Sequence, residues 1–428
     1  MSATPCAMIY NPLTGHGHLD SWNALFVAFL LERGWRVVSL SPGDADLRLR
    51  LAQKGLLSHP HLYIGEWDHP QRSFGERVRG RIKRTTESFV KNISLWQKPP
   101  SAERGCDTTN NETVSDPEAG YLIPMEFAQR VRSVSKEAPW YPDFVFNMYI
   151  DLYRTDAASW QRFEAIQKIS WAGIRFVPTD INGTAPKEAY YDLRSLRGMC
   201  FLDEEICARY RQKRPQQCFG YLPDITEAAL PETPSQLVAE IQALARGRRI
   251  VFMGGTIGSN KNLDRWAQVI KLADPEKWFF VQIGEVHVNN LTAEDRIAFE
   301  ELQHDPKEHF FMLTEYLPDE RVFNEVITAS DILFAVYRNF TISSNMPGKA
   351  AAFNKPILVA SGHLVGRRVE EYRIGRLVSE ERPDLMLEQL HRLADAPPSP
   401  ESFAAYRHDF SHAALCDNFF EFLEKSCA

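Results

Sequence analysis

The sequence predicts an α/β fold with two Rossmann-like domains that face a ligand cleft. Two observations lead to this prediction. A strand, a glycine-containing loop, a helix and a second strand follow one another within the first forty residues, and the same order begins again after residue 240. Such βαβ units require parallel strands joined by right-handed crossovers. The length of 428 residues agrees with two or three domains, since one domain commonly holds ~100–200 residues.

Composition excludes several classes of protein. Hydrophobic residues make up 44% of the chain and charged residues 25%, as in ordinary globular proteins. The 49 Lys and Arg are outnumbered by 56 Asp and Glu, whereas nucleic-acid-binding proteins usually have a basic balance, so we expect no nucleic-acid partner. The seven Cys are scattered and include no Cys-x-x-Cys pair. We therefore expect reduced thiols and no metal site.

The sequence has no apolar stretch of the ~20 residues that span a bilayer and no secretory leader, which predicts a cytoplasmic protein. One segment leaves two interpretations open. Residues 72–96 combine a run of Arg and Lys with apolar residues at helical spacing. This helix either lies peripherally on an anionic membrane at its cytoplasmic face, or it packs on its own domain with a solvated basic face.

The first domain is expected over residues 1–230, with the basic helix and a flexible loop inserted at 66–140. Its opening unit has a strand at Ala7–Tyr10, a loop at Asn11–Asp20, a helix capped by Asp20 or Ser21, and a strand at Arg36–Ser41. Further elements are expected farther along this domain. They are strands at Asp143–Met148 and Ile174–Pro178, and a helix at Asp156–Lys168.

The proline-containing stretch Pro215–Glu240 is predicted to be a linker, and the second domain to cover 231–401. Residues 402–428 are expected to form a terminal helix that returns to the first domain. The βα rhythm of the second domain predicts five strands and a helix at Leu263–Leu272. The strands are Arg249–Met253, Trp278–Ile283, Phe310–Leu313, Ile332–Phe334 and Pro356–Ala360.

A glycine-rich loop, Gly254–Asn262, separates the first strand and helix of the second domain. Gly254, Gly255 and Thr256 let a phosphate approach the backbone, and Lys261 adds a positive charge. The loop matches neither the P-loop pattern nor the Rossmann glycine spacing. Its other interpretation is a tight turn without a ligand.

A second loop in this domain carries Ser343, Ser344 and Asn345 where a helix is expected to begin. Hydroxyl groups and free helix N–H groups together can bind an anion. The same residues are also ordinary helix N-caps. Two such loops at the carboxyl edge of one sheet favour a shared ligand.

In the first domain, His16 and His18 lie in the loop Thr14–Gly-His-Gly-His18. A histidine has a pKa near neutrality and can act as a general base, so both are candidate catalytic residues. The other interpretation is that they are exposed or structural histidines. The sequence contains no Gly-x-Ser-x-Gly nucleophile motif.

These segments together resemble the GT-B nucleotide-sugar glycosyltransferases, in particular those with a family-4-like (group 1 type) donor domain. The resemblance rests on NPLTGHGHLDSWNALFVAFLLERGWRVVSLSPG near the N-terminus and on three segments of the second half. Those segments are VFMGGTIGSNKNLDRW, TEYLPDERVFNEVITASDILFAVYRNF and SSNMPGKAAAFNKPILVASGHLVGRRVEEYRIGRLV.

The resemblance implies a donor site in the second domain and an acceptor site in the first. Lys261 would contact the donor diphosphate, with Arg338 or Arg367 adding positive potential, and Glu315 and Tyr316 would form the base pocket. Family-4 enzymes usually carry two Glu eight positions apart around the donor helix. This chain has Thr341 and Lys349 there, which leaves the ribose contact to Glu370 or Glu371.

The implied activity is metal-independent transfer of a hexosyl group from a UDP- or GDP-linked sugar to a hydroxyl of a glycan, a lipid-linked or a small-molecule acceptor. The nucleotide sugar is a co-substrate, and no further cofactor is expected. His16 would be the base if the reaction inverts, and a leaving phosphate oxygen would serve if it retains. Two alternatives stay open: a nucleotide-sugar epimerase of the same fold, and a catalytically silent scaffold, which the Thr341 and Lys349 departures suggest.

Overall fold

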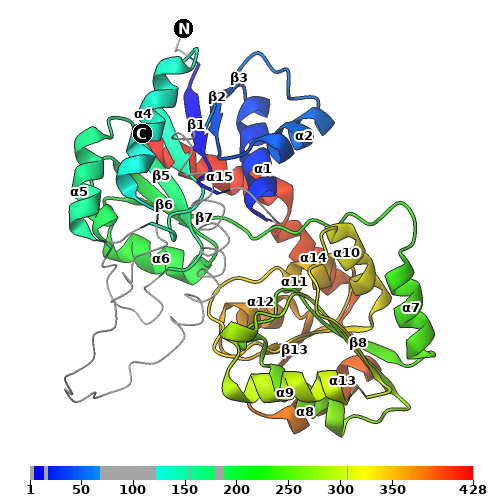
Figure 1. Cartoon of the computed structure of the whole chain (residues 1–428). Coiled ribbons are helices and arrows are strands. Elements are labelled where there is room, and N and C mark those ends of the chain that lie inside the picture. Colours follow the sequence, from blue (N-terminus) through cyan, green and yellow to red (C-terminus); the bar gives the residue numbers. More distant parts are fainter. Residues whose placement is uncertain are drawn as a thin grey trace, which may run out of the picture. The chain divides into compact units, whose positions relative to one another are not determined.

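The computed structural model describes residues 4–13, 18–67, 122–153, 156–178, 188–305 and 307–427. They form two compact units (Figure 1). The N-terminal unit contains the described residues up to Leu222 together with the chain from Cys416 on, and the C-terminal unit contains Pro223–Leu415. The basic segment 72–96 and the loop at Ser101–Gly120 lie outside the described residues.

The N-terminal unit is built on a seven-stranded parallel sheet in the order β3-β2-β1-β4-β5-β6-β7. The strand order reverses between β1 and β4, where Tyr10 pairs with Asn147. The strands are β1 (Cys6–Tyr10), β2 (Arg36–Leu40), β3 (Leu62–Ile64), β4 (Phe144–Asn147), β5 (Ser170–Arg175), β6 (Leu196–Phe201) and β7 (Cys218–Tyr221).

Helices cover both faces of this sheet. One face packs on aromatic side chains of α4, α5 and α6, among them Phe127 and Trp160. On the other face the ring of Phe419, from the terminal helix α15, contacts Phe26 of α1 and Phe146 of β4. The helices are α1 (His18–Glu32), α2 (Ala45–Gln53), α4 (Pro124–Glu137), α5 (Ala157–Ile166), α6 (Glu204–Lys213) and α15 (His412–Cys427), with a 3-10 turn η2 (Ala189–Asp192).

The C-terminal unit has a six-stranded parallel sheet in the order β10-β9-β8-β11-β12-β13. Each strand except the outer ones is buried on both faces, which explains why the sequence shows continuous apolar runs in place of alternation. The strands are β8 (Arg249–Gly254), β9 (Trp278–Ile283), β10 (Phe310–Leu313), β11 (Ile332–Ala335), β12 (Ile357–Ala360) and β13 (Gly375–Val378).

Two sets of helices sandwich this second sheet. α8, α9 and α13 bury one face, and α7, α10, α11, α12 and α14 the other (Figure 1). The helices are α7 (Gln236–Ala245), α8 (Leu263–Leu272), α9 (Ala293–His304), α10 (Glu320–Ala329), α11 (Met346–Ala352), α12 (Leu364–Tyr372), α13 (Pro383–Asp395) and α14 (Pro400–Asp409). Two 3-10 turns, η3 (Ser259–Lys261) and η4 (Val288–Asn290), follow β8 and β9.

The predicted fold class is confirmed, and three local predictions are wrong. The helix expected to be capped by Asp20 or Ser21 begins earlier, at His18, so both residues lie inside α1. The strand expected at Ile174–Pro178 is β5, which begins at Ser170 and ends at Arg175. The next two N–H groups, of Phe176 and Val177, donate to the Asp151 carboxylate and not to a neighbouring strand. The stretch Pro215–Glu240 is only partly a linker, because Cys218–Tyr221 pairs with β6 and α7 begins at Gln236. The residues of β7 are few and include Gly220, so they carry little local strand signal.

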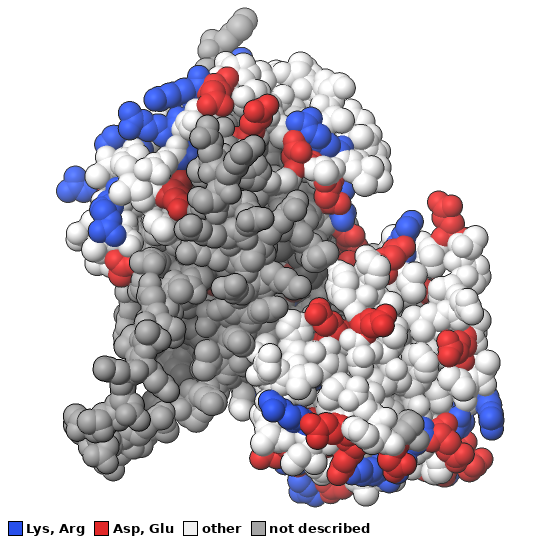
Figure 2. Space-filling view, in the orientation of Figure 1, with Lys and Arg blue, Asp and Glu red and all other residues white. Residues whose placement is uncertain are grey.

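The surface carries both signs of charge. Figure 2 shows Lys and Arg interspersed with Asp and Glu over the visible part of the C-terminal unit, while basic side chains gather over α4 and α5 of the N-terminal unit. The net charge of −7 is thus an average over differing regions. Among the described helices, none combines the length and the apolar character that a transmembrane segment requires.

Candidate active site

The glycine-rich loop of the C-terminal unit lies at the carboxyl edge of its sheet, where the strand order reverses between β8 and β11. Ligands of open α/β sheets bind at this edge. Gly255 adopts φ of 88°, a backbone conformation that glycine favours, and its carbonyl oxygen lies against Gly284 so closely that a Cβ there would approach it to 1.9 Å. The loops that follow β8 and β9 are therefore packed backbone to backbone.

Lys261 is the cation of this loop, and its ε-ammonium group points back toward the end of β8. It donates hydrogen bonds to the Gly254 carbonyl oxygen at 2.8 Å and to the Tyr337 hydroxyl at 3.2 Å. Nζ also lies 4.4 Å from the centroid of the Tyr337 ring, within the range of a cation–π contact. An ammonium group has three protons, so one remains for a ligand oxygen. The end of β8 and the loop after β11 thus hold the positive charge at the switch point, the place where the strand order reverses.

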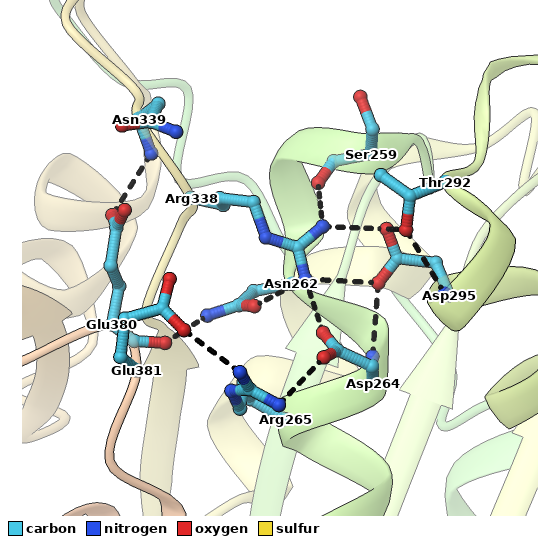
Figure 3. Close-up of polar contacts among 10 residues, drawn as sticks. All are labelled: Ser259, Asn262, Asp264, Arg265, Thr292, Asp295, Arg338, Asn339, Glu380 and Glu381. Carbon is cyan, nitrogen blue, oxygen red and sulfur yellow. Dashed lines mark hydrogen bonds and ion pairs between the residues drawn. The ribbon is translucent and has the colours of Figure 1, made fainter.

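Arg338 follows Tyr337, and its guanidinium group lies among carboxylates (Figure 3). It pairs with Asp264 at the start of α8 and donates to Asp295 of α9 at 2.7 Å. It also donates to the Ser259 carbonyl oxygen at 3.3 Å and to the Asn262 side-chain oxygen at 2.9 Å. The backbone N–H of Arg338 binds the Asn260 carbonyl oxygen at 2.9 Å, so this residue fastens the glycine-rich loop to the loop after β11.

The same network reaches the segment after β13. The Asn262 amide donates to the Glu380 carbonyl oxygen at 2.7 Å, and the Asn339 backbone N–H donates to the Glu380 carboxylate at 2.9 Å (Figure 3). Arg265 bridges Asp264 and Glu381 at 2.9 and 2.8 Å. The sequence predicted Arg338 beside a donor diphosphate. In the structure its charge is already balanced by two carboxylates, which gives it a positioning role for the loop.

Ser343, Ser344 and Asn345 precede α11, and two of them hold the segment that connects the two units. Ser343 donates to the Asp224 carboxylate at 2.7 Å, and Asn345 shares a hydrogen bond with Thr226. The Ser344 hydroxyl accepts from the N–H of Met346, the first residue of α11, at 3.3 Å, while the N-cap residue Asn345 makes no side-chain capping bond. α11 has only seven residues, so its dipole adds little. The structure brings these side chains together for internal contacts, which the sequence did not indicate.

Lys349 also serves the connecting segment. Its side chain is buried and donates to the Glu227 carbonyl oxygen at 2.8 Å, the Asn324 side-chain oxygen at 2.6 Å and the Glu320 carboxylate at 2.5 Å. Burial lowers the pKa of Lys349, although the Glu320 charge opposes that shift. Lys349, at the position where a glutamate is expected, therefore has a structural role: it joins the connecting segment to α10.

The predicted base-pocket residues follow β10. Glu315 and Tyr316 are both exposed, and Tyr316 has a raised pKa because of partial burial and the nearby charges of Glu320 and Glu285. Glu371 lies exposed in the last turn of α12. None of these side chains reaches Lys261 by a described contact.

The structure describes the backbone of one of the two predicted catalytic histidines. His16 lies outside the described residues, and His18 is the first residue of α1, without a described side chain. Their role stays a prediction.

The N-terminal sheet carries a polar cluster at its carboxyl edge that sequence reasoning missed. Asp151 accepts the backbone N–H groups of Phe176 and Val177 at 2.8 and 2.9 Å. Arg175, at the end of β5, lies 3.5 Å from the Asp151 carboxylate and 2.5 Å from that of Glu188. Burial raises the pKa of Asp151 against the opposing charge of Arg175. A charged residue at the carboxyl end of a buried strand, Arg175, is the signal that could have pointed to this cluster.

Within the described ranges, no group of three or more His, Cys, Asp or Glu side chains is arranged to hold a metal ion. No protein-family model matches this sequence, and none of the curated proteins matches it.

Solved structures of other proteins align with this chain over both of its units. An α,α-trehalose 6-phosphate synthase from Burkholderia multivorans aligns over 98% of this chain and 96% of its own, with a TM-score of 0.64 at 11% identity. Anabaena HepE, solved in complex with UDP and glucose, aligns over 98% and 99% with a TM-score of 0.60 at 10% identity. Sucrose-phosphate synthase from Thermosynechococcus elongatus aligns over 99% of both chains with a TM-score of 0.58 at 10% identity.

The chain has the GT-B fold. This confirms the fold that the sequence resemblance implied, including the two Rossmann-like sheets. In this GT-B chain the glycine-rich loop, Lys261 and Tyr337 lie at the switch point of the C-terminal sheet. Identity near 10% shows the fold and not the reaction.

Proposed function

We propose that this protein transfers a sugar from a nucleotide-diphosphate sugar to an acceptor hydroxyl, with UDP or GDP as the leaving group. The GT-B neighbours include a synthase of trehalose 6-phosphate and a protein solved with UDP and glucose, which supports this kind of reaction. The observation that carries the proposal is the placement of Lys261. A fixed ammonium group with an uncommitted proton lies beside a glycine-rich loop at the ligand edge of the sheet.

The mechanism follows from charge. Cleavage of the bond between the sugar and the diphosphate leaves negative charge on the diphosphate, and a cation that is already in position stabilises that charge without reorganisation. The proposal assigns this role to Lys261 and to the backbone N–H groups after Gly255, and to no metal ion. Lys261 is held by Gly254 and Tyr337, so it does not have to be ordered when the donor binds.

The acceptor is assigned to the N-terminal unit, and a glycan, a lipid-linked or a small-molecule hydroxyl would fit this class of reaction. If the reaction inverts, His16 is the candidate base that removes the acceptor proton. If it retains, a leaving phosphate oxygen takes that proton. The cytoplasmic location and the membrane contact through residues 72–96 stay predictions.

A second candidate function is a GT-B scaffold that binds without catalysis. This alternative is favoured because residues expected to contact the donor make hydrogen bonds within the protein. Ser343 binds Asp224 and Asn345 binds Thr226. All three protons of the Lys349 ammonium group are donated to protein oxygens. The carboxylates that a family-4 donor helix usually presents are replaced by Thr341 and Lys349.

One experiment separates the two. The purified chain is titrated calorimetrically with UDP, GDP and ADP, and is then incubated with UDP-glucose, GDP-mannose and a panel of sugar acceptors while release of the nucleotide diphosphate is followed. Acceptor-dependent release of UDP or GDP supports transfer. Binding without release supports the scaffold, release without any acceptor points to hydrolysis or epimerase-type chemistry, and no binding of any nucleotide diphosphate contradicts the proposed transferase.

A further inference from the structure

Lys349 and Glu320 form an ion pair whose two halves differ in exposure. The Lys349 side chain is 3% exposed and the Glu320 side chain 40% exposed, although their charged atoms lie 2.5 Å apart. Lys349 is thus buried, while the Glu320 carboxylate that it binds is partly exposed to solvent. Buried charges are normally paired and hydrogen-bonded, because an unpaired buried charge lowers the stability of the fold. Lys349 therefore favours a conformation in which Glu320 stays beside it.

Lys349 has no proton left for a ligand. Its three N–H groups are used by the Glu227 carbonyl oxygen, the Asn324 side chain and Glu320. Glu320 is different, because an ionised carboxylate offers about four acceptor positions. Within the described part of the chain, Lys349 is the one residue that donates to this carboxylate. Lys349 therefore orients Glu320, and Glu320 keeps capacity to accept hydrogen bonds from a ligand.

The helix that Glu320 begins contacts the start of the glycine-rich loop. Glu320 begins α10, and Phe323 follows three residues later on the same side of the helix. The Phe323 ring contacts the backbone at Gly254, where an added Cβ would approach it to 2.8 Å. Gly254 is also the residue whose carbonyl oxygen binds Lys261. The helix that begins with Glu320 thus contacts the end of β8 at which the Lys261 ammonium group is held.

An exposed aromatic ring lies in the same stretch of chain as this carboxylate. Tyr316 is four positions before Glu320 and is 47% exposed, and the Glu320 charge is one cause of its raised pKa, after burial. A flat apolar face beside a hydrogen-bond acceptor suits a nucleoside, whose base stacks on aromatic rings and whose ribose carries two adjacent hydroxyl donors.

We propose that Glu320 is the residue that binds the ribose hydroxyls of the nucleotide, and that Lys349 is the positioning residue that orients it. The proposal rests on the proposed nucleotide-diphosphate sugar site and adds the group that selects ribonucleotides over deoxyribonucleotides. It replaces Glu370 or Glu371 in that role, because those residues lie at the far end of α12 and have no described contact with α10 or with the glycine-rich loop.

The experiment compares UDP with 2′-deoxy-UDP, and GDP with 2′-deoxy-GDP, by calorimetric titration of the full chain. The wild type is expected to bind the ribonucleotide about 10- to 100-fold more tightly, the usual range for loss of one hydrogen bond to a charged group. Glu320→Gln is expected to remove most of that preference by weakening the ribonucleotide, while the affinity for the deoxyribonucleotide changes little.

Three variants complete the test. Glu371→Gln represents the rival site, and Glu294→Gln is the matched control, an exposed glutamate in the first turn of α9. Both are expected to keep the preference. Lys349→Met is expected to reduce it, and its thermal unfolding shows whether it folds. If that variant does not fold, Glu320→Gln decides alone, because its side chain is partly exposed and can be replaced without emptying the core.

The outcomes separate this inference from the proposed function. An unchanged ribonucleotide preference in Glu320→Gln, or its loss in Glu371→Gln, overturns the inference even if sugar transfer is measured. A preference that depends on Glu320 in a chain that transfers no sugar supports the inference and contradicts the transferase. If none of the nucleotides binds, both fail.

Discussion

Nη1 of Arg338 donates a 2.7 Å hydrogen bond to the carboxylate of Asp295, which is completely buried. The two residues are 43 positions apart, one after β11 and the other in the first turn of α9. The same carboxylate accepts the backbone N–H of Asp264 at 3.0 Å and the Thr292 hydroxyl at 2.9 Å (Figure 3). One buried ion pair thus joins the loops that position Lys261.

Arg338→Met is expected to lower the free energy of unfolding by about 3–5 kcal/mol, because it takes the guanidinium group away from the buried Asp295 carboxylate and leaves Asp264 with Arg265 as its cation. Urea unfolding at pH 7 measures this. Arg321→Met is the control, since Arg321 pairs with Asp319 on the surface, where solvent screening leaves an ion pair little effect on stability. Equal losses in the two variants would contradict the buried-network interpretation.

The pH dependence of the free energy of unfolding should reflect the protonation of Asp295. Burial by itself raises its pKa, but the hydrogen bonds and the charge of Arg338 outweigh burial, so the pKa in the folded state is lowered. A lowered folded-state pKa means that the stabilisation is present above the unfolded value of about 4 and is lost as the pH falls through the folded pKa.

The stability advantage of the wild type over Asp295→Asn is therefore expected to shrink between pH 5 and pH 3. Urea midpoints at pH 7, 5, 4 and 3 test it, and the comparison with the variant removes the contributions of carboxyl groups outside this network. Burial raises the pKa of the neighbouring Asp264, so its own contribution has the opposite sign. A constant difference between wild type and variant across this range would show that Asp295 does not carry the effect.

Lys261→Ala is expected to weaken binding of UDP or GDP by about 1.5–3 kcal/mol, roughly 10- to 100-fold, through loss of one charge-assisted contact. Calorimetric titration gives the affinity, and thermal unfolding shows whether the loop is still formed. Lys271→Ala removes an exposed lysine of the same unit, paired with Glu301, and should leave the affinity unchanged. The role given to Lys261 fails if its variant binds the nucleotide diphosphate as tightly as the wild type.

Gly284→Ala should displace the glycine-rich loop. The new Cβ would meet the Gly255 carbonyl oxygen at 1.9 Å, and φ of 151° already disfavours a side chain. We expect a loss of about 1–3 kcal/mol of stability together with weaker nucleotide binding.

Gly247→Ala is the matched control for this change. Gly247 also has a positive φ, 81°, but a Cβ there meets nothing within 4 Å. The Gly247→Ala variant should be destabilised only by the backbone strain of a side chain at positive φ, and its affinity for nucleotide should be unchanged. If both variants bind nucleotide equally well, the contact of Gly284 with Gly255 does not shape the site.

Local signals predicted the opening of the C-terminal unit accurately. The helix expected at Leu263–Leu272 and the strands expected at Trp278–Ile283 and Phe310–Leu313 have those bounds in the structure. Runs of apolar residues bounded by glycine and polar residues identify such elements from neighbouring positions alone. β13 at Gly375–Val378 was missed, because it has only four residues and begins with Gly375, whose close approach to Ile357 appears only in the folded sheet.

The candidate site was predictable only in part. Glycine, a lysine and a strand–helix junction pointed to the loop that holds Lys261, because that signal is contained in a few consecutive residues. The partners of Arg338 and Lys349 could not be predicted. Asp295 and Glu320 stand 43 and 29 positions away, and a single sequence does not show which distant carboxylate a cation meets.

The sequence by itself determined two parallel α/β units, their main strands and the position of a glycine-rich loop with one lysine. These features follow from apolar runs and turn residues that act over short stretches of chain. Only the tertiary structure decided how the charges are used: Lys261 is held beside Tyr337, Arg338 is neutralised between Asp264 and Asp295, and Lys349 orients Glu320. The physical reason is that burial makes each charge depend on a partner, and the sheet order brings those partners together.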